Sequence, residues 1–291
     1  MKLNYCIKSN DDYITVRNVL KGYFHVSTRL LMKLKKNNCI FLNDVSASLD
    51  THVTCGDVVS FSLDYEEDNS NIVPTEMSLD IIYEDNSLLI VNKPPFMAVH
   101  PTSYHFDDTL SNGIIYYYNK IGLKKKIRPV NRLDRNTSGL VIFAKNEYIQ
   151  ECLITQMADN IFEKKYLGIV EGLLPNKEGK IDAPISRKEN SIIERKVDDD
   201  GFPSITHYKV LKEYNNYSLV EFTLETGRTH QIRVHLQHIG HPLLGDSLYG
   251  KESSLINRQA LHCHYLCFTH PITRKQIKLE CPLPDDMSSL I

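Results

Sequence analysis

The sequence predicts an α+β protein with two parts, a large domain on a mixed sheet with flanking helices and a small N-terminal α/β domain. The chain has 291 residues, more than one compact domain usually holds. Its apolar segments are mostly short and strand-like, with few helical patterns between them. An acidic, polar stretch at residues 65–71 precedes Pro74 and has the composition of a linker. We therefore expect domains at residues 1–70 and 75–291.

The N-terminal part contains a clear helix signal at residues 28–36, where Ser27 can cap the first turn. Its three leucines lie at spacings of three and four and predict an apolar face. Its other face is basic and includes Arg29 and Lys33.

Two short strands follow this helix, at 39–42 and 58–61, with a turn at 43–44. This order, over about residues 14–61, resembles the alpha-L RNA-binding module of ribosomal proteins and several RNA-modifying enzymes. The resemblance implies that the basic face of the helix contacts RNA. The alternative is a packing helix with an ordinary solvated face.

The larger part alternates strands with a few helices. The expected elements are a strand at 88–91, helices from Asp108 or Thr109 to Tyr118 and at 147–158, strands at 161–170, 205–211 and 219–224, and a helix at 229–239. Gly240 and Pro242 end the last helix. The sequence contains no internal repeat, Walker-type loop or Gly-x-Gly-x-x-Gly pattern, so nucleotide-dependent chemistry has no support.

The composition is that of an ordinary globular protein, with 42% hydrophobic and 24% charged residues. No apolar run approaches the roughly 20 residues that span a bilayer, and the first residues lack a secretory signal, so no membrane partner is expected. The seven cysteines include no Cys-x-x-Cys pair. Reduced thiols in a cytoplasmic protein explain them best.

The strongest candidate for a chemical site is the segment 131–140. It places one carboxylate, Asp134, between Arg132 and Arg135, just before a buried strand at 140–144. The arginines favour the ionised carboxylate, which suits a nucleophile or base. A surface loop with ordinary ion pairs is the alternative reading.

Charge is distributed unevenly along the chain. The net charge is −2, but residues 120–135 contain seven Lys or Arg side chains and a single acid. Because phosphate contact is a local matter, this strip can bind a polyanion. A solvated basic loop is the alternative.

A second candidate segment, 227–236, predicts a helix on which Arg233 and His230 leave the apolar stripe. An arginine there can hold a carboxylate from a neighbouring strand bidentately. Otherwise it is a basic face that contacts solvent or phosphate.

With both segments, the chain resembles the RluA-type pseudouridine synthases, which isomerise uridine in ribosomal or transfer RNA. The resemblance covers nearly all of residues 80–287. Its motifs are Asn-Lys-Pro-Pro at 92–95, Val-His-Pro at 99–101, Arg-Leu-Asp-Arg at 132–135, Thr-Ser-Gly-Leu at 137–140, Lys-Tyr-Leu at 165–167, and the segments 227–235, 240–250, 260–262 and 282–284.

This resemblance implies a mixed, mostly antiparallel sheet and a catalytic trio of Asp134, Tyr166 and Arg233. Asp134 would attack ribose C1′ or base C6, or promote glycal formation, and the sequence leaves these routes open. Tyr166 offers a ring face to the base and a hydroxyl that can assist removal of the C5 proton. An isomerisation needs no redox cofactor, nucleotide or metal.

RNA contacts are expected beyond the catalytic trio. The target nucleotide must leave its stack, at a cost of a few kcal/mol, and Arg132 or Arg135 could fill the vacated space or hold phosphate. Further RNA contacts are expected from Arg228, His230, Arg187 and Arg195. Ribosomal RNA is the expected partner, transfer RNA the alternative, and a monomer the expected state. Two departures from the family pattern, Asn131 for histidine and Gly168 for alanine, bear on substrate fit.

Two other functions are compatible with parts of the sequence. One is a non-catalytic RNA-binding or ribosome-assembly protein on the same scaffold. The other is a metal-dependent phosphoesterase built on the histidines of residues 230–241. A zinc cluster at residues 262–267 is disfavoured, because strand alternation points His262 and His264 away from both cysteines.

Overall fold

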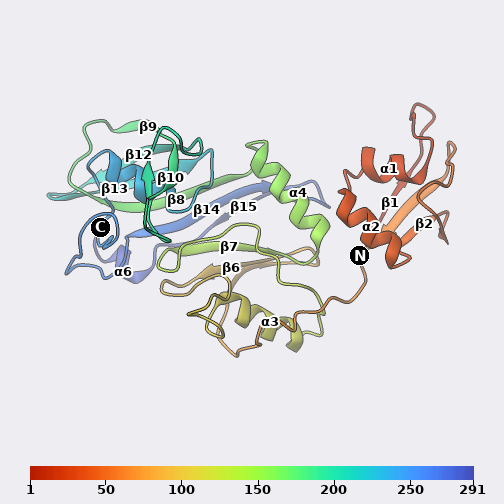
Figure 1. Ribbon diagram of the computed structural model, residues 1–291, viewed down its shortest axis with the longest axis horizontal. Coiled ribbons are helices and arrows are strands. Elements are labelled where there is room, and N and C mark those ends of the chain that lie inside the picture. The colour runs from red at the N-terminus through yellow and green to blue at the C-terminus, as the bar shows by residue number, and fades with distance from the viewer.

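A four-stranded antiparallel sheet and two helices form the N-terminal part of the molecule. The strands lie in the order β1 (Lys2–Cys6), β4 (Val58–Ser62), β2 (Ile40–Leu42) and β3 (Val45–Ser46), with α1 (Val16–Gly22) and α2 (Thr28–Lys36) packed beside them (Figure 1). The computed structural model describes all of residues 1–291.

Local sequence signals account for this small sheet. Ser27 caps α2 by accepting a hydrogen bond from the Leu30 backbone N–H at 3.2 Å, and the leucines of α2 are buried, as predicted. The turn between β2 and β3 places Asn43 and Asp44 at φ +50° and +64°. Such a pair of positive φ angles matches the twist of a tight hairpin.

A nine-stranded mixed sheet forms the rest of the molecule. Eight of its strands lie in the order β5 (Asp80–Glu84), β6 (Leu88–Lys93), β7 (Ser138–Ala144), β14 (Leu261–Thr269), β8 (Glu163–Glu171), β13 (Tyr217–Leu224), β12 (Ile205–Glu213) and β9 (Glu178–Asp182), and β15 (Gln276–Glu280) also pairs with β14. Only β7 and β14 run parallel, so the expected mostly antiparallel sheet is confirmed.

Helices flank this sheet (Figure 1). They are α3 (Leu110–Lys120), α4 (Glu147–Ala158), α5 (Gln231–His238) and the short α6 (Asp285–Ser288). The bounds of α4 are those predicted, whereas α5 begins two residues later than expected because His230 has a left-handed backbone, at φ 59°. A separate hairpin, β10 (Ile185–Arg187) with β11 (Arg195–Val197), contacts α5. No helix is both long and apolar enough to cross a bilayer.

The two halves of the large sheet meet over a very short contact. β7 and β14 pair only through His262 with Ser138 and Cys263 with Gly139. Gly139 has φ +116°, and a Cβ there would lie 2.3 Å from the Cys263 carbonyl oxygen. Only glycine permits this close approach, which brings the start of β7 against the strands of the other half.

The free edge of β7 is covered by residues 128–131. The Val130 N–H donates to the Ile142 carbonyl and the Ala144 N–H donates to the Arg128 carbonyl, both at 2.8 Å. This pairing leads the chain directly into the loop that carries Asp134.

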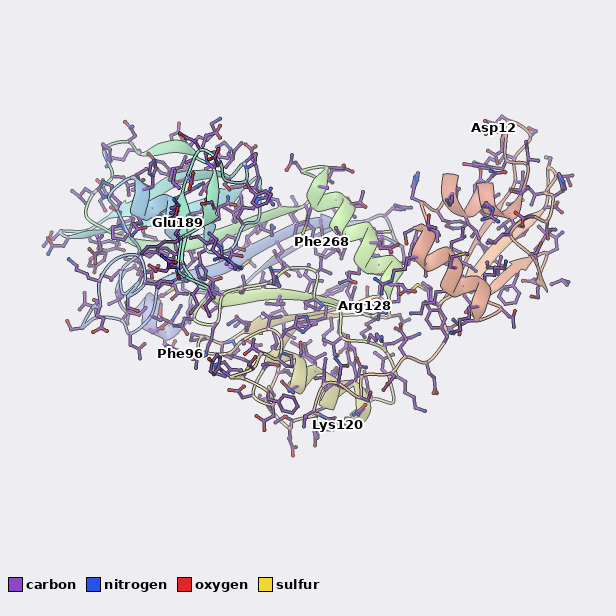
Figure 2. All side chains as sticks on the ribbon, viewed as in Figure 1. Asp12, Phe96, Lys120, Arg128, Glu189 and Phe268 are labelled. Atoms are coloured by element: carbon purple, nitrogen blue, oxygen red, sulfur yellow. The ribbon has the colours of Figure 1, made fainter.

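The N-terminal part is joined to the large domain by buried ion pairs rather than by a free linker. Glu67, 3% exposed, accepts two hydrogen bonds from Arg128 and one from Lys33, and Lys33 also pairs with Glu147 of α4 at 3.0 Å. Figure 2 shows Arg128 at this junction. Burial would raise the pKa of the Glu67 carboxyl, but the two cations outweigh it and hold that pKa at about 2.

This junction corrects the interpretation of the basic strip. Lys124 pairs with Glu66, the Lys125 ammonium donates to the carbonyls of Leu63 and Tyr65, and Arg128 binds Glu67. Lys33, expected to contact RNA, is neutralised by two carboxylates here. These contacts hold residues 63–69 in place and occupy Lys33, Lys125 and Arg128, whereas Lys124 is 65% exposed and stays accessible to phosphate.

Candidate active site

Asp134 lies on a short loop that joins residues 128–131, which run along the edge of β7, to Ser138, the first residue of β7. The Thr137 N–H donates to the Asp134 carbonyl at 3.1 Å and closes a turn. Only 25% of the Asp134 side chain is exposed. The loop is rigid because buried cations from elsewhere in the fold bind its backbone.

Two buried side chains, Lys93 at the end of β6 and Arg258 just before β14, donate hydrogen bonds to backbone carbonyls of this loop. The Lys93 ammonium donates to the carbonyls of Pro94, Met97 and Arg135 at 2.8–3.0 Å. Arg258 binds Asp286 bidentately and donates to the Asn136 carbonyl at 3.0 Å. Neither residue was predicted to support the site, although a charge beside an apolar strand was a usable signal.

Arg233 pairs with Asp134, as the resemblance implied, but not bidentately. Its Nη1 donates one hydrogen bond of 3.1 Å to Asp134 Oδ2. Its Nε and Nη2 donate instead to the two oxygens of Asp246, at 2.7 and 2.8 Å. Burial opposes the Arg233 charge, but the two carboxylates outweigh burial and raise the guanidinium pKa. The guanidinium is thus permanently charged and shared between two acids.

Asp246 is the functional residue that the sequence interpretation missed. Its side chain is fully buried, and its Oδ1 also accepts hydrogen bonds from the N–H groups of Leu248 and Tyr249. Gly245 before it has φ +73°, and a Cβ there would lie 2.4 Å from the Arg258 carbonyl. The available signal was a single aspartate among the leucines of the segment Leu-Leu-Gly-Asp-Ser-Leu at 243–248.

His230 faces Asp134 from the first turn of α5. Its Nε2 lies 3.8 Å from Asp134 Oδ2, and its Nδ1 lies 2.8 Å from the Tyr249 hydroxyl. That hydroxyl also accepts a hydrogen bond from the Arg195 backbone N–H at 2.8 Å. Burial lowers the pKa of the imidazole, against the pull of Asp134. Nε2 is thus the imidazole nitrogen that lies nearer to the carboxylate.

Tyr166 lies on β8, across the groove from the Asp134 loop. Its side chain is buried, and its backbone pairs with Cys263 of β14 and Phe222 of β13. Burial, with smaller contributions from Cys263 and Asp134, raises the pKa of its phenol well above the usual value. The phenol is therefore neutral at physiological pH, and its ring is fixed between two strands.

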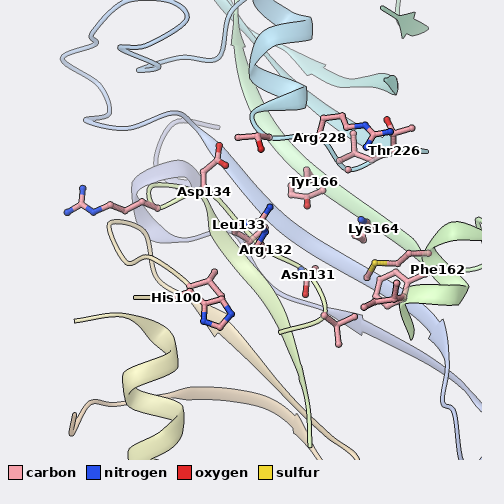
Figure 3. Close-up of a pocket in the computed structure, with 18 of the residues that line it drawn as sticks. His100, Asn131, Arg132, Leu133, Asp134, Phe162, Lys164, Tyr166, Thr226 and Arg228 are labelled. Atoms are coloured by element: carbon pink, nitrogen blue, oxygen red, sulfur yellow. The ribbon is translucent and has the colours of Figure 1, made fainter. Parts of the chain in front are cut away.

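These side chains surround two adjoining cavities. The wider one, a groove of about 840 Å³, is bordered by Asp134 and Tyr166 (Figure 3). A smaller one of about 70 Å³ reaches inward to Arg233. Arg132 and Arg228 border both cavities. The structure thus brings together six of the predicted site residues around these cavities: Asp134, Tyr166, Arg132, Arg228, Arg233 and His230.

Of the other predicted RNA contacts, Arg135 borders the wide groove but not the smaller cavity, and Arg187, Arg195 and Arg29 border neither. Arg187 and Arg195 face each other across the β10–β11 hairpin, and the Arg195 guanidinium donates to the Ile193 and Glu194 carbonyls. Arg29 lies on the exposed side of α2, in the N-terminal part.

Comparison with known proteins decides the family. A family model described as RNA pseudouridylate synthase matches residues 87–238. The chain belongs to this family. It is 40% identical over 290 residues to an uncharacterized RNA pseudouridine synthase of Bacillus subtilis, YhcT, spanning 99% of this chain and 96% of that protein.

Other relatives agree with this assignment. Ribosomal large subunit pseudouridine synthase D of Neisseria meningitidis serogroup A is 36% identical over 88% of this chain and 72% of its own length. The solved structure of human RNA pseudouridylate synthase domain containing 1 has a TM-score of 0.59 and 26% identity, covering 70% of this chain and 83% of that one. The protein is an RNA pseudouridine synthase of the RluA type, an isomerase that converts uridine in RNA to pseudouridine.

Both departures from the family pattern have structural roles in this synthase. Asn131 is buried, and its amide accepts the Ile142 N–H and donates to the Leu140 carbonyl, at 2.9 and 3.0 Å. A Cβ on Gly168 would lie 2.8 Å from the Phe222 ring and 2.9 Å from Leu243. Both positions thus make packing or hydrogen-bonding contacts within the sheet; Asn131 also borders the wide groove, whereas Gly168 borders neither cavity.

The histidines do not form a metal centre in this synthase. No group of three or more His, Cys, Asp or Glu side chains is close enough to hold an ion. His262 pairs with the Ser138 hydroxyl at 2.9 Å, and His235 with the Thr206 hydroxyl and the Ala183 carbonyl. These residues serve the packing of the sheet against α5 and β7.

Proposed function

We propose that this synthase modifies uridines of large-subunit ribosomal RNA and that Asp134 is its nucleophile. The choice of RNA is supported by the similarity to the Neisseria enzyme, which is named for the ribosomal large subunit. The choice of nucleophile is supported by the geometry around the carboxylate.

One observation carries the catalytic assignment. Arg233 holds Asp134 Oδ2 with a single hydrogen bond, while Oδ1 accepts none from the protein and the side chain is 25% exposed. One oxygen is therefore oriented by a fixed cation, and the other is free to meet a substrate. A carboxylate with hydrogen bonds to both oxygens would have no free oxygen for nucleophilic attack.

The chemistry follows from that free oxygen. The uridine leaves its stack and enters the groove, the N1–C1′ bond breaks, the base turns, and a C5–C1′ bond forms. C5 then loses its proton and N1 gains one, so the atoms balance without a co-reactant. Attack of Asp134 on C1′, attack on C6, and glycal formation are all compatible with this position.

Tyr166 is proposed to hold the base rather than to act as a phenolate. Its ring borders both cavities beside Asp134. Because its pKa is raised by burial, the hydroxyl keeps its proton and acts as a hydrogen-bond partner during removal of the C5 proton.

The remaining roles follow from position in the fold. Arg132, Arg135 and Arg228 at the groove are proposed to contact RNA beside the everted nucleotide. The N-terminal part is proposed to be an alpha-L-type RNA-binding accessory that uses Arg29. We further propose a cytoplasmic monomer, consistent with seven unpaired cysteines.

Mapping pseudouridine in cellular RNA tests this function. Cells lacking the protein are compared with cells carrying the wild type or Asp134→Asn. We expect specific uridines of large-subunit ribosomal RNA to lose modification and to regain it only with the wild type. Loss confined to transfer RNA would refute the choice of substrate, and restoration by Asp134→Asn would refute the nucleophile.

A further inference from the structure

Lys164 lines the wide groove and forms no ion pair or side-chain hydrogen bond with the rest of the protein. It lies on β8 two residues before Tyr166, so the two side chains share one face of the strand about 7 Å apart. Both border the wide groove, but Lys164 does not border the inner cavity around Arg233. Figure 3 shows it on the groove wall between Tyr166 and Phe162.

The Lys164 ammonium has no partner in the protein. No carboxylate oxygen lies within 4.0 Å of its Nζ and no acceptor receives a hydrogen bond from it, although the side chain is mostly buried and burial lowers its pKa. Other buried cations here are fully paired, as Lys93 is with three carbonyls and Arg258 with Asp286. A partly buried ammonium that borders an open groove and has no partner in the protein is available to an external anion.

The neighbouring lysine shows the contrast. Lys165 points to the opposite face of β8, where its Nζ lies 3.4 Å from Glu163 and 3.6 Å from Glu221. One residue of sequence thus separates a neutralised lysine on one face from an unpaired lysine on the other.

We propose that the Lys164 ammonium binds a backbone phosphate of the RNA strand next to the everted uridine. This inference rests on the proposed function only in that the groove admits an RNA strand with its target nucleotide everted. Phosphate is the anion that RNA brings to such a groove, and lysine binds it as a point charge. The distance of Lys164 from the inner cavity places that phosphate outside the pocket for the base.

Salt dependence of binding provides the first test, with a labelled oligouridine of about ten nucleotides as the probe. We expect Lys164→Met to weaken binding about tenfold, as for one charge-assisted hydrogen bond, and to reduce the slope of log affinity against log salt by about 0.7. Lys165→Met and Lys164→Arg should keep the wild-type slope. An unchanged slope in Lys164→Met, with a wild-type unfolding curve, would overturn the proposal.

Removal of single phosphate charges provides the second test. In a ribosomal RNA fragment that the wild type modifies, each phosphate near the target is replaced in turn by a neutral methylphosphonate. We expect one replacement to weaken wild-type binding without weakening Lys164→Met further, whereas equal losses at every position would contradict the assignment. Lys164→Gln serves if the methionine variant does not fold. Failure of the wild type to form any pseudouridine would instead contradict the proposed function and leave the salt test standing.

Discussion

The carboxylate of Asp246 holds the Arg233 guanidinium with two hydrogen bonds of 2.7 and 2.8 Å, whereas Asp134 receives one of 3.1 Å. Asp246 is in turn fixed by two backbone N–H groups. The arginine is therefore oriented by a buried acid that cannot reach the substrate, and it leaves one oxygen of Asp134 free. Asp246, Arg233 and Asp134 thus form one connected set of ion pairs.

Asp246→Asn should separate orientation from RNA binding. The amide keeps the shape but removes the charge that holds Arg233, so Arg233 can turn toward Asp134 and engage both of its oxygens. We expect kcat at saturating RNA to fall by roughly a hundredfold, from the loss of positioning, while RNA affinity stays near wild type. Stability should fall by about 3 kcal/mol, because the buried guanidinium loses one of its two carboxylates. Wild-type kcat in a folded variant would show that Asp246 does not orient the site.

Tyr166 should show separate contributions from its ring and its hydroxyl. Tyr166→Phe keeps the ring, so we expect RNA affinity to remain and kcat to fall by roughly tenfold, the scale of one lost hydrogen bond. Tyr166→Ala should lose affinity as well, because a stacking face disappears. Single-turnover rates and equilibrium binding measure the two effects. Equal rates for Tyr166→Phe and the wild type would remove the hydroxyl from the mechanism.

The junction at Glu67 should fix the N-terminal part to the large domain. Glu67→Gln leaves Arg128 and Lys33 with Glu147 as their one remaining carboxylate partner, and we expect a loss of about 3 kcal/mol in stability. Residues 63–71 should also become sensitive to limited proteolysis. Glu66→Gln is the matched control, since Glu66 is 74% exposed and pairs only with Lys124. If both variants resist proteolysis equally, the cluster does not hold the junction.

His262 should make the fold sensitive to mild acid. Burial lowers its pKa from 6.5 to about 4, so below pH 6.5 the unfolded chain takes up a proton that the folded chain does not. Stability should therefore fall as pH drops from about 6.5 to about 4, by roughly 2–3 kcal/mol in all. Denaturant unfolding of His262→Asn should lack this part of the decline. Exposed His52→Asn is the control, and identical pH profiles for the wild type and His262→Asn would contradict the assignment.

Local patterns predicted much of the fold. The capping serine of α2, the apolar periodicity of α4 and the strand-like run of β6 are properties of short segments, and the structure has each of them. The left-handed residue His230 was not visible in a helical pattern, so the start of α5 was placed too early. Short edge strands such as β9 and β15 carry little apolar signal and were not predicted.

Site residues that belong to a sequence motif could be predicted. Contacts between segments distant in the sequence could not. The meeting of Arg233 with Asp134 could be inferred from the family resemblance, but the bidentate partner could not. The basic strip looked continuous in sequence, yet its members diverge in space. Arg132 borders the groove, whereas Arg128 forms an ion pair with the buried Glu67. A count of charges cannot distinguish a cation with a partner from one without.

Asp134→Asn tests the central claim most directly. Purified wild type and variant are given the same ribosomal RNA fragment, and pseudouridine formation and RNA affinity are both measured. The free oxygen of Asp134 predicts a loss of activity on the order of 10⁴-fold or more, with affinity within a few-fold of wild type. Pseudouridine formation by Asp134→Asn at a rate within tenfold of wild type would contradict the account.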